Sequence, residues 1–239
     1  MSPERQHVLE TVANALLAAR RVDRALRVVI DGRSAAGKTT FADELARTLR
    51  NFGAVTLRAS IDEFHPAGYS KESRGWSPEE YISRGFDYQA FRELFLDPLG
   101  PQGNGIARLR FHQAASDRPY PPEWVTASPQ TVAIADAGFA FVPALEGSWD
   151  VSIWLHISFE TMVTRAMERD VAWVGNADVV RQRYVSHWIQ THQLYEERYS
   201  GEQRADWLID NEDFERPAIL KSPSGAAEPI APIEVSNPP

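Results

Sequence analysis

The chain has 239 residues, 43% hydrophobic and 24% charged, which is the composition of a globular protein with one sizeable core. A net charge of −8 argues against nucleic acid as the main partner, and the absence of cysteine excludes disulfides and thiol catalysis. The absence of cysteine fits a cytoplasmic protein, and since no apolar run reaches the length of a membrane-spanning helix, we expect no membrane partner.

The first predicted elements are a helix and a strand. Apolar residues recur at helical spacing through residues 4–20, which predicts an amphipathic helix rather than a signal peptide. We expect this helix to pack on the domain without a functional role. Residues 27–30 form a β-branched run that is typical of a buried strand.

The predicted strand leads into residues 32–39, which match the phosphate-loop pattern G-x-x-x-x-G-K-[ST]. Lys38 would neutralise charge between the β- and γ-phosphates, and the Thr39 hydroxyl would hold Mg²⁺. A helix predicted at residues 40–49 adds an N-terminus that attracts anions. The sequence therefore predicts ATP and Mg²⁺ as ligands, with the nucleotide held by Gly32, Arg33, Ser34, Ala35, Ala36, Gly37, Lys38, Thr39 and Thr40.

Acidic residues follow two further predicted strands. Residues 54–59 lead to Asp62, and residues 131–136 end in Asp136, as in a Walker B segment. Acids at the carboxyl ends of parallel strands lie where open α/β sheets bind ligands, so Asp136 is a second candidate ligand for Mg²⁺. The alternative interpretation makes Asp62 a loop or cap acid and Asp136 a helix cap.

The remaining pattern continues to alternate between helices and strands. Helices are expected to start at Ser77 and Asp87 and to cover residues 158–170 and 178–198, with a hairpin or edge strand at 106–112 and strands at 151–157 and 205–210. With the phosphate loop, this predicts a three-layer α/β P-loop NTPase fold with a mainly parallel five-stranded sheet. The domain would span residues 1–216, with 1–26 packed on it, and 217–239 would be a Pro-rich, poorly ordered tail.

Several segments together resemble the uridine kinase family of P-loop nucleoside kinases. The resemblance covers roughly residues 27–211. Besides the phosphate loop it rests on Asp62-Glu63-Phe64-His65, Gly85-Phe86-Asp87-Tyr88, Asp97-Pro98-Leu99, Ala135-Asp136-Ala137-Gly138, Arg165 with Arg169-Asp170, and Ala205-Asp206 with Asp210-Asn211.

The resemblance implies roles for individual residues. It implies that Asp62 accepts the proton of the attacking hydroxyl, that Asp87 holds sugar hydroxyls and that Arg169 lies near the ATP phosphates. Arg165 lies four residues before Arg169, on the same helical face, and is a further candidate for the phosphates. His112 stands where the family has an aspartate, so we assign it to the acceptor site.

Each of these assignments has a structural alternative. Asp87 has the form of an ordinary helix N-cap, and Arg165 with Arg169 could belong to a solvated ion-pair row. Trp76 either stacks on a base or only fills space. The closely spaced lid arginines of the family are missing here, so Arg181 or Arg183 would have to replace them.

The sequence as a whole predicts an ATP- and Mg²⁺-dependent kinase of a small hydroxylated metabolite, with a nucleoside such as uridine or cytidine as the acceptor. Two alternatives stay open: a kinase of another alcohol (pantothenate, a phosphosugar or an antibiotic-like molecule), and a nucleotide-binding regulatory protein with little catalysis. The base of the donor, adenine or guanine, and homo-oligomerisation are not decided. The loop after Ile209 is the expected region for the base.

Overall fold

The computed structural model describes residues 1–223, apart from the side chain of Trp173. Its helices are α1 (Pro3–Ala18), α2 (Lys38–Asn51), α3 (Tyr69–Glu72), α4 (Pro78–Arg84), α5 (Tyr88–Phe91), α6 (Asp97–Leu99), α7 (Phe159–Val174), α8 (Ala177–Arg183), α9 (Ile189–Tyr199) and α10 (Gly201–Arg204). Short 3₁₀ turns lie at Ile61–Glu63 and Pro143–Leu145. Single π-helical turns, Arg92–Leu96 and Tyr184–Trp188, join α5 to α6 and α8 to α9. No helix in residues 1–223 is both long and apolar enough to span a bilayer.

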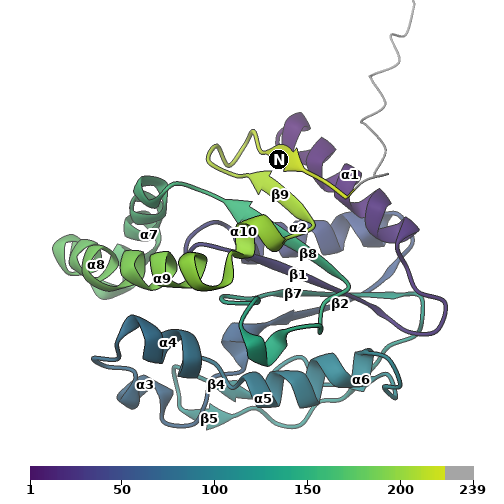
Figure 1. Cartoon of the computed structure of the whole chain (residues 1–239), viewed down its shortest axis with the longest axis horizontal. Helices are drawn as coiled ribbons and strands as arrows, with labels where there is room; N and C mark the ends of the chain where they lie inside the picture. Colours follow the sequence, from purple (N-terminus) through teal and green to yellow (C-terminus); the bar gives the residue numbers. More distant parts are fainter. Residues whose placement is uncertain (224–239) are drawn as a thin grey trace, which may run out of the picture.

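A central sheet of six strands runs through the molecule in the order β10-β9-β8-β1-β7-β2 (Figure 1). Its strands are β1 (Leu26–Gly32), β2 (Val55–Ser60), β7 (Thr131–Asp136), β8 (Val151–His156), β9 (Trp207–Asp210) and β10 (Ala218–Lys221). The first five are parallel, as predicted, and β10 pairs antiparallel with β9. The predicted fold class is confirmed, but the expected number of five strands is wrong.

The additional strand lies inside the segment for which we predicted no regular structure. Residues 218–221 are too few for a visible alternation and follow a proline. Their conformation comes from pairing with a distant partner, since Ile219 opposes Ile209. Residues 224–239 of the predicted tail lie outside the described residues.

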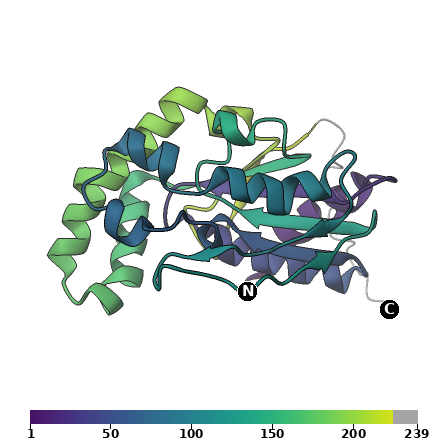
Figure 2. The same ribbon diagram turned by 90° about the horizontal axis from the view of Figure 1, so that it is seen from below.

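Helices cover both faces of the sheet, because alternate residues of a strand point to opposite sides. On β1, Val28 and Ile30 pack in one cluster with α1, α2 and α7, whereas Val29 packs in the other with α4, α5 and α9. Figure 1 shows α1 above the sheet, α5 and α6 below it and α4 below α9, and Figure 2, seen from below, shows the helical segment of residues 88–99 in front of the strands. The three layers are the predicted ones.

The chain segment between α6 and β7 forms two small two-stranded sheets. Strand β3 (Ile106–Ala107) pairs with β6 (Val125–Thr126), and β4 (His112–Gln113) pairs with β5 (Arg118–Pro119). A parallel bridge between Phe64 and His112 ties the second of these hairpins to the segment after β2. The hairpin therefore borders the carboxyl end of the central sheet.

Helices α7, α8 and α9 form the helical lid that the resemblance to the uridine kinase family implies. Helix α7 ends at Gly175, whose φ of +77° is the left-handed conformation favoured by glycine. Asn176 then caps α8 by accepting hydrogen bonds from the backbone of Asp178 and Val179. This tight turn sends α8 and α9 back beside α7, at the left of Figure 1.

Candidate active site

A cavity of about 780 Å³ opens where β1, β2 and β7 end. The phosphate loop, the segment after β2, the 112–120 hairpin and the lid helices all contribute to its walls. The residues on it that the following argument uses are Ser34, Gly37, Lys38, Thr39, Thr40, Asp62, Glu63, His65, Tyr69, Tyr81, Phe86, Tyr120, Asp136, Phe139, Arg165, Arg169, Tyr184, Trp188, His192 and Phe214.

The backbone of residues 32–39 has the conformation of an anion nest. A Cβ on Gly32 would lie 2.4 Å from the carbonyl oxygen of Leu155, so only glycine fits against β8. Gly37 begins α2 with a φ of +87°, and Ala35 also has a positive φ of +58°. Alternating left- and right-handed residues turn successive N–H groups inward, which suits a phosphate.

The lysine and threonine of the loop face a carboxylate on the neighbouring strand. Lys38 Nζ donates to the carbonyl oxygens of Gly32 at 3.0 Å and Arg33 at 2.9 Å. Thr39 Oγ1 donates to Asp136 Oδ2 at 2.7 Å. A hydroxyl beside a carboxylate is a hard oxygen pair that suits Mg²⁺, which keeps water and phosphate as its other ligands.

Asp136 has protein partners besides Thr39. Arg58 on β2 forms an ion pair with Asp136 Oδ1 at 2.5 Å, and Ser60 Oγ donates to its Oδ2 at 3.1 Å. Neither residue was predicted, because pairing between neighbouring strands, and not local sequence, brings Arg58 and Ser60 next to Asp136. Asp136 is 3% exposed, so these partners offset the cost of burying its charge.

A second buried carboxylate, Asp31, stands at the start of the loop. Its oxygens accept hydrogen bonds from the backbone of Gly32 and Ala140 and from the hydroxyl of Tyr195, at 2.6–2.9 Å. Burial raises the pKa of Asp31, and the nearby Lys38 ammonium opposes that shift. Asp31 therefore joins the phosphate loop, the segment after β7 and α9. No role was predicted for Asp31, although it directly precedes the first glycine of the loop.

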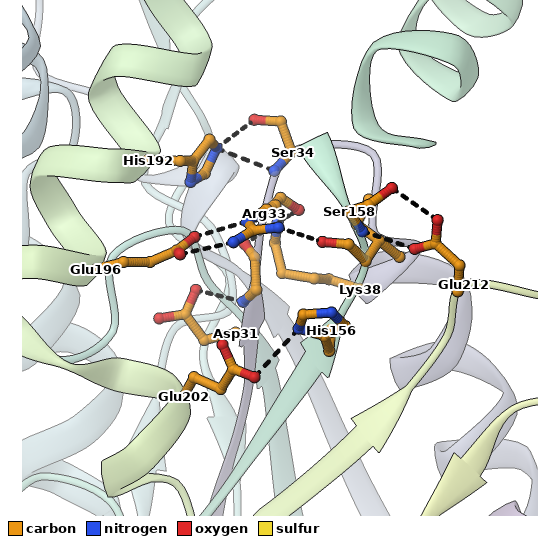
Figure 3. Close-up of polar contacts among 12 residues, drawn as sticks. Asp31, Arg33, Ser34, Lys38, His156, Ser158, His192, Glu196, Glu202 and Glu212 are labelled. Atoms are coloured by element: carbon orange, nitrogen blue, oxygen red, sulfur yellow. Dashed lines mark hydrogen bonds and ion pairs between the residues drawn. The ribbon is translucent and has the colours of Figure 1, made fainter. Parts of the chain in front are cut away.

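The side chain of Arg33 points away from the nest (Figure 3). Its guanidinium binds both carboxylate oxygens of Glu196 at 2.7 Å, donates to the carbonyl of Ile157 and lies 3.8 Å over the Phe159 ring. Because the guanidinium is held by these groups, only the backbone of Arg33 is available for the contact with the nucleotide that we predicted. Arg33 fastens the loop to α9 and to the start of α7.

His192 makes a second contact from α9 to the loop. Its Nε2 accepts the backbone N–H of Ser34 at 3.0 Å and lies 2.9 Å from Ser34 Oγ, as Figure 3 shows. An acceptor nitrogen must be unprotonated, so the ring is neutral with its proton on Nδ1. Burial, with Lys38 and Arg33 nearby, holds the pKa of His192 well below its ordinary value.

Replacing His192 with Gln should flatten the dependence of stability on pH. Because the folded-state pKa is depressed, the unfolded chain takes up the proton first, and stability is lost as pH falls below about 6.5. Each such group contributes up to about 1.4 kcal/mol per pH unit. Gln keeps an acceptor for Ser34 but does not titrate, so the loss of unfolding free energy between pH 7 and 5, measured by urea denaturation, should shrink.

The matched control is His7→Gln on the exposed face of α1. Burial also lowers the pKa of His65 and His187, so part of the pH dependence should persist in both variants. Identical pH slopes for His192→Gln and the unmodified protein would contradict the assigned protonation state.

Asp62 lines the same cavity as the loop lysine. It follows β2 in a short 3₁₀ turn, and its side chain opens on the cavity. The surrounding protein displaces water and raises the pKa of Asp62, as does the charge of Asp136, while His65 and Lys38 act in the opposite direction. A carboxylate with a raised pKa at a cavity surface is suited to accept a proton.

Beyond Asp62 the cavity has an aromatic wall, which consists of His65, Tyr69, Tyr81, Phe86, Phe139 and Trp188. His65 stacks on Tyr69 at 3.9 Å and donates from Nδ1 to the carbonyl of Gly85 at 2.6 Å, which leaves its Nε2 as an acceptor. Tyr81 packs edge-on against Trp188 at 4.6 Å and shares a hydrogen bond with the Tyr69 hydroxyl. None of these residues was predicted, since four separate segments supply them.

Two predicted acceptor residues are not among those that line the cavity in the described chain. Asp87 caps α5 by accepting the backbone N–H of Ala90 at 2.9 Å, which is the structural alternative stated above. His112 is 5% exposed, with its Nε2 3.8 Å from Asp117. Trp76 packs edge-on against Tyr69 and Tyr81, behind the aromatic wall.

Both predicted lid arginines line the cavity, but protein groups hold their guanidinium groups. Arg169 pairs with Asp170 at 2.6 Å and donates to the Tyr184 hydroxyl at 3.0 Å. Arg165 donates to two carbonyls after β9, and its Nη1 is buried without a protein partner. Arg181 and Arg183 are exposed and do not line the described cavity.

Several solved structures share the fold of this chain. Three solved structures with this fold illustrate the similarity. A protein from Bacillus stearothermophilus described as a possible uridine kinase has a TM-score of 0.63 and 17% identity, over 84% of this chain and 96% of that one. A protein from a Silicibacter species, described as a fructose transport system kinase, has a TM-score of 0.63 and 22% identity, over 79% of this chain and 94% of that one.

The third is D-glycerate 3-kinase from Cryptococcus neoformans, with a TM-score of 0.59 and 11% identity over 92% of this chain and all of that one. No protein-family model matches the chain, and neither does any curated protein sequence. The resemblance to uridine kinases predicted from the sequence is therefore confirmed at the level of the fold.

Proposed function

We propose that this protein is an ATP- and Mg²⁺-dependent kinase that phosphorylates a hydroxyl of a nucleoside such as uridine or cytidine. The observation that carries the proposal is a single cavity that is lined both by the phosphate nest and by Asp62. Phosphoryl transfer needs positioning, charge neutralisation and an acceptor for one proton, and these groups supply each of them.

The reaction follows from where these groups lie. The nest and Lys38 hold the β- and γ-phosphates, and Thr39 with Asp136 would hold Mg²⁺, which neutralises phosphate charge. Asp62 accepts the proton of the acceptor hydroxyl while its oxygen bonds to the γ-phosphorus. The bond from that phosphorus to the oxygen bridging the β-phosphate breaks, and ADP leaves. Arg169 can turn from Asp170 to the transferring group, since its own side chain lines the cavity.

Two observations support a nucleoside as the acceptor. The cavity-lining cations of the described chain, Lys38, Arg165 and Arg169, come from the phosphate loop and α7, and none belongs to the segments that carry the aromatic wall. A phosphosugar or a carboxylate acceptor would need a positive group there, whereas a neutral flat ring would stack. One protein with this fold is described as a possible uridine kinase.

A panel of acceptors tests this proposal. We expect ADP release from MgATP with uridine or cytidine at a rate at least about a hundred times that with fructose, glycerate or pantothenate. Clear preference for one of the other alcohols would contradict the nucleoside as the acceptor but would still support a kinase. ATP binding without ADP release for any acceptor would instead favour a nucleotide-dependent regulatory protein.

A further inference from the structure

Helix α1 carries one buried arginine that reaches the loop after β9, which is the region where we expect the nucleotide base to bind. Arg5 is fully buried, although it lies only two residues after the helix begins. Its Nε donates to Glu44 on α2 at 2.8 Å. A buried guanidinium with one carboxylate partner still has several donors to satisfy, so its other contacts decide why it is there.

Those contacts are with the loop after β9, residues 211–216. Arg5 Nη1 donates to Asn211 Oδ1 at 3.1 Å and to the carbonyl of Phe214 at 2.9 Å. The guanidinium carbon also lies 3.9 Å from the centre of the Phe214 ring. One side chain thus holds both the backbone and the ring of Phe214.

The same loop contacts the phosphate nest and the lid. Asn211 Nδ2 donates to the carbonyl of Ala36 at 2.7 Å, and Arg165 donates to the carbonyls of Asn211 and Glu212 at 2.9 Å. At its far end, Ser2 donates to Glu215 from its backbone N–H at 3.1 Å. Helix α1 therefore secures a loop that connects the phosphate loop with α7.

Phe214 forms part of the cavity wall beside Gly37, Thr40 and Arg165. A Cβ on Gly37 would lie 3.8 Å from the Phe214 ring, so the ring borders the start of α2, where the nest ends. The side chain of Arg165 lines the same cavity, and its Nη1 is, like Arg5 Nη2, a buried donor without a protein partner in the described residues. An aromatic face and an unsatisfied donor next to a phosphate site suit the base of a nucleotide.

We propose that Arg5 is a positioning residue for the nucleotide base: it fixes Phe214 so that the free face of the ring receives the purine. The inference rests on the proposed function, because it assumes that the nest holds a nucleotide. It gives α1, for which the sequence suggested no functional role, a part in nucleotide affinity. Arg5 contributes through Phe214 and Asn211 without touching the ligand.

The test compares a ligand that has a base with one that has none. Arg5→Lys keeps a positive charge beside Glu44 but loses the fork that reaches Asn211 and Phe214. We expect the dissociation constant for MgADP, measured by calorimetry, to rise about tenfold, and that for inorganic tripolyphosphate to change less than about twofold. Phe214→Leu should reproduce this selective loss, and the double variant should add little to it.

Arg47→Lys, on the exposed face of α2, is the matched control and should leave both constants unchanged. Equal weakening of MgADP and tripolyphosphate by Arg5→Lys, or no weakening of either, would overturn the inference and leave the proposed function intact. Binding of neither ligand by the unmodified protein would overturn both. Selective loss in a protein that binds MgADP but phosphorylates no acceptor would support the role of Arg5 and contradict the kinase.

Discussion

Replacing Asp62 with Asn should lower turnover by at least about a hundredfold while nucleotide binding persists. The substitution keeps the size of the side chain and removes its ability to take a proton from the acceptor. It also removes a negative charge from a cavity built for phosphate, so the dissociation constant for MgADP should stay the same or fall slightly. Steady-state ADP release and calorimetry measure the two effects separately.

The dependence of the rate on pH adds an independent test of the same role. Because the surrounding protein displaces water and the charge of Asp136 is close, the pKa of Asp62 is raised, and kcat/KM should fall on the acid side through a pKa above the ordinary value of about 4. The direction follows from the mechanism, since the deprotonated form is the active one. The residual activity of Asp62→Asn should lack this acid limb.

Glu63 provides the matched control for Asp62, because it is the adjacent carboxylate and lines the same cavity. It hydrogen bonds with Tyr120 and raises the pKa of that phenol, which indicates a structural task. Glu63→Gln should keep turnover within about tenfold of the unmodified protein. A collapse of turnover in Glu63→Gln with near-normal turnover in Asp62→Asn would reassign the proton acceptor.

The sequence was sufficient to predict the features that are determined by residues close together in the chain. The phosphate loop of residues 32–39 needs glycine where a strand passes closely and where a helix starts, and both needs are visible in a short motif. Five strands were predicted from short runs of residues, and two of them, β1 and β7, are buried along their whole length. The N-caps Ser77, Asp87 and Ser158 were predicted in the same way, from the residues that begin a helix.

The parts that sequence reasoning missed arise from contacts between distant segments. Strand β10 forms by pairing with β9, where Ile219 lies opposite Ile209. Arg58 contacts Asp136 only because β2 pairs with β7. His192 reaches Ser34 across more than 150 residues, and Arg5 reaches Phe214 across more than 200. A single sequence carries no periodicity that marks such pairs.

Asp87 shows the opposite limit. Its place in a resemblance suggested a ligand for sugar hydroxyls, while its place before a helix suggested a cap, and both features occupy the same residue. In the structure its carboxylate accepts the N–H of Ala90 and does not line the described cavity. A capping oxygen could still turn towards a ligand, so the sugar contact stays a prediction that an acceptor-bound structure would test.

Lys38→Met should have the other large effect, and it should reach both binding and turnover. Met keeps the length and much of the apolar stem but removes the ammonium group that faces the phosphate nest. Losing a charged donor in a largely water-excluded site costs about 3 kcal/mol, or about a hundredfold in affinity for MgADP. The loss of transition-state charge stabilisation should bring turnover below about a thousandth of its original value.

The effect of Lys38→Met should differ in kind from that of Arg5→Lys. The ammonium serves the phosphates, so inorganic tripolyphosphate should lose affinity together with MgADP, whereas the Arg5 variant should spare tripolyphosphate. Lys38 also offsets the charges of Asp31, Asp62 and Asp136, so its removal should raise the pKa of Asp62 and move the acid limb of any residual activity to higher pH. Lys71→Met, at an exposed position on α3, provides the matched control. Unchanged tripolyphosphate affinity in Lys38→Met would mean that the loop of residues 32–39 is not where phosphate binds.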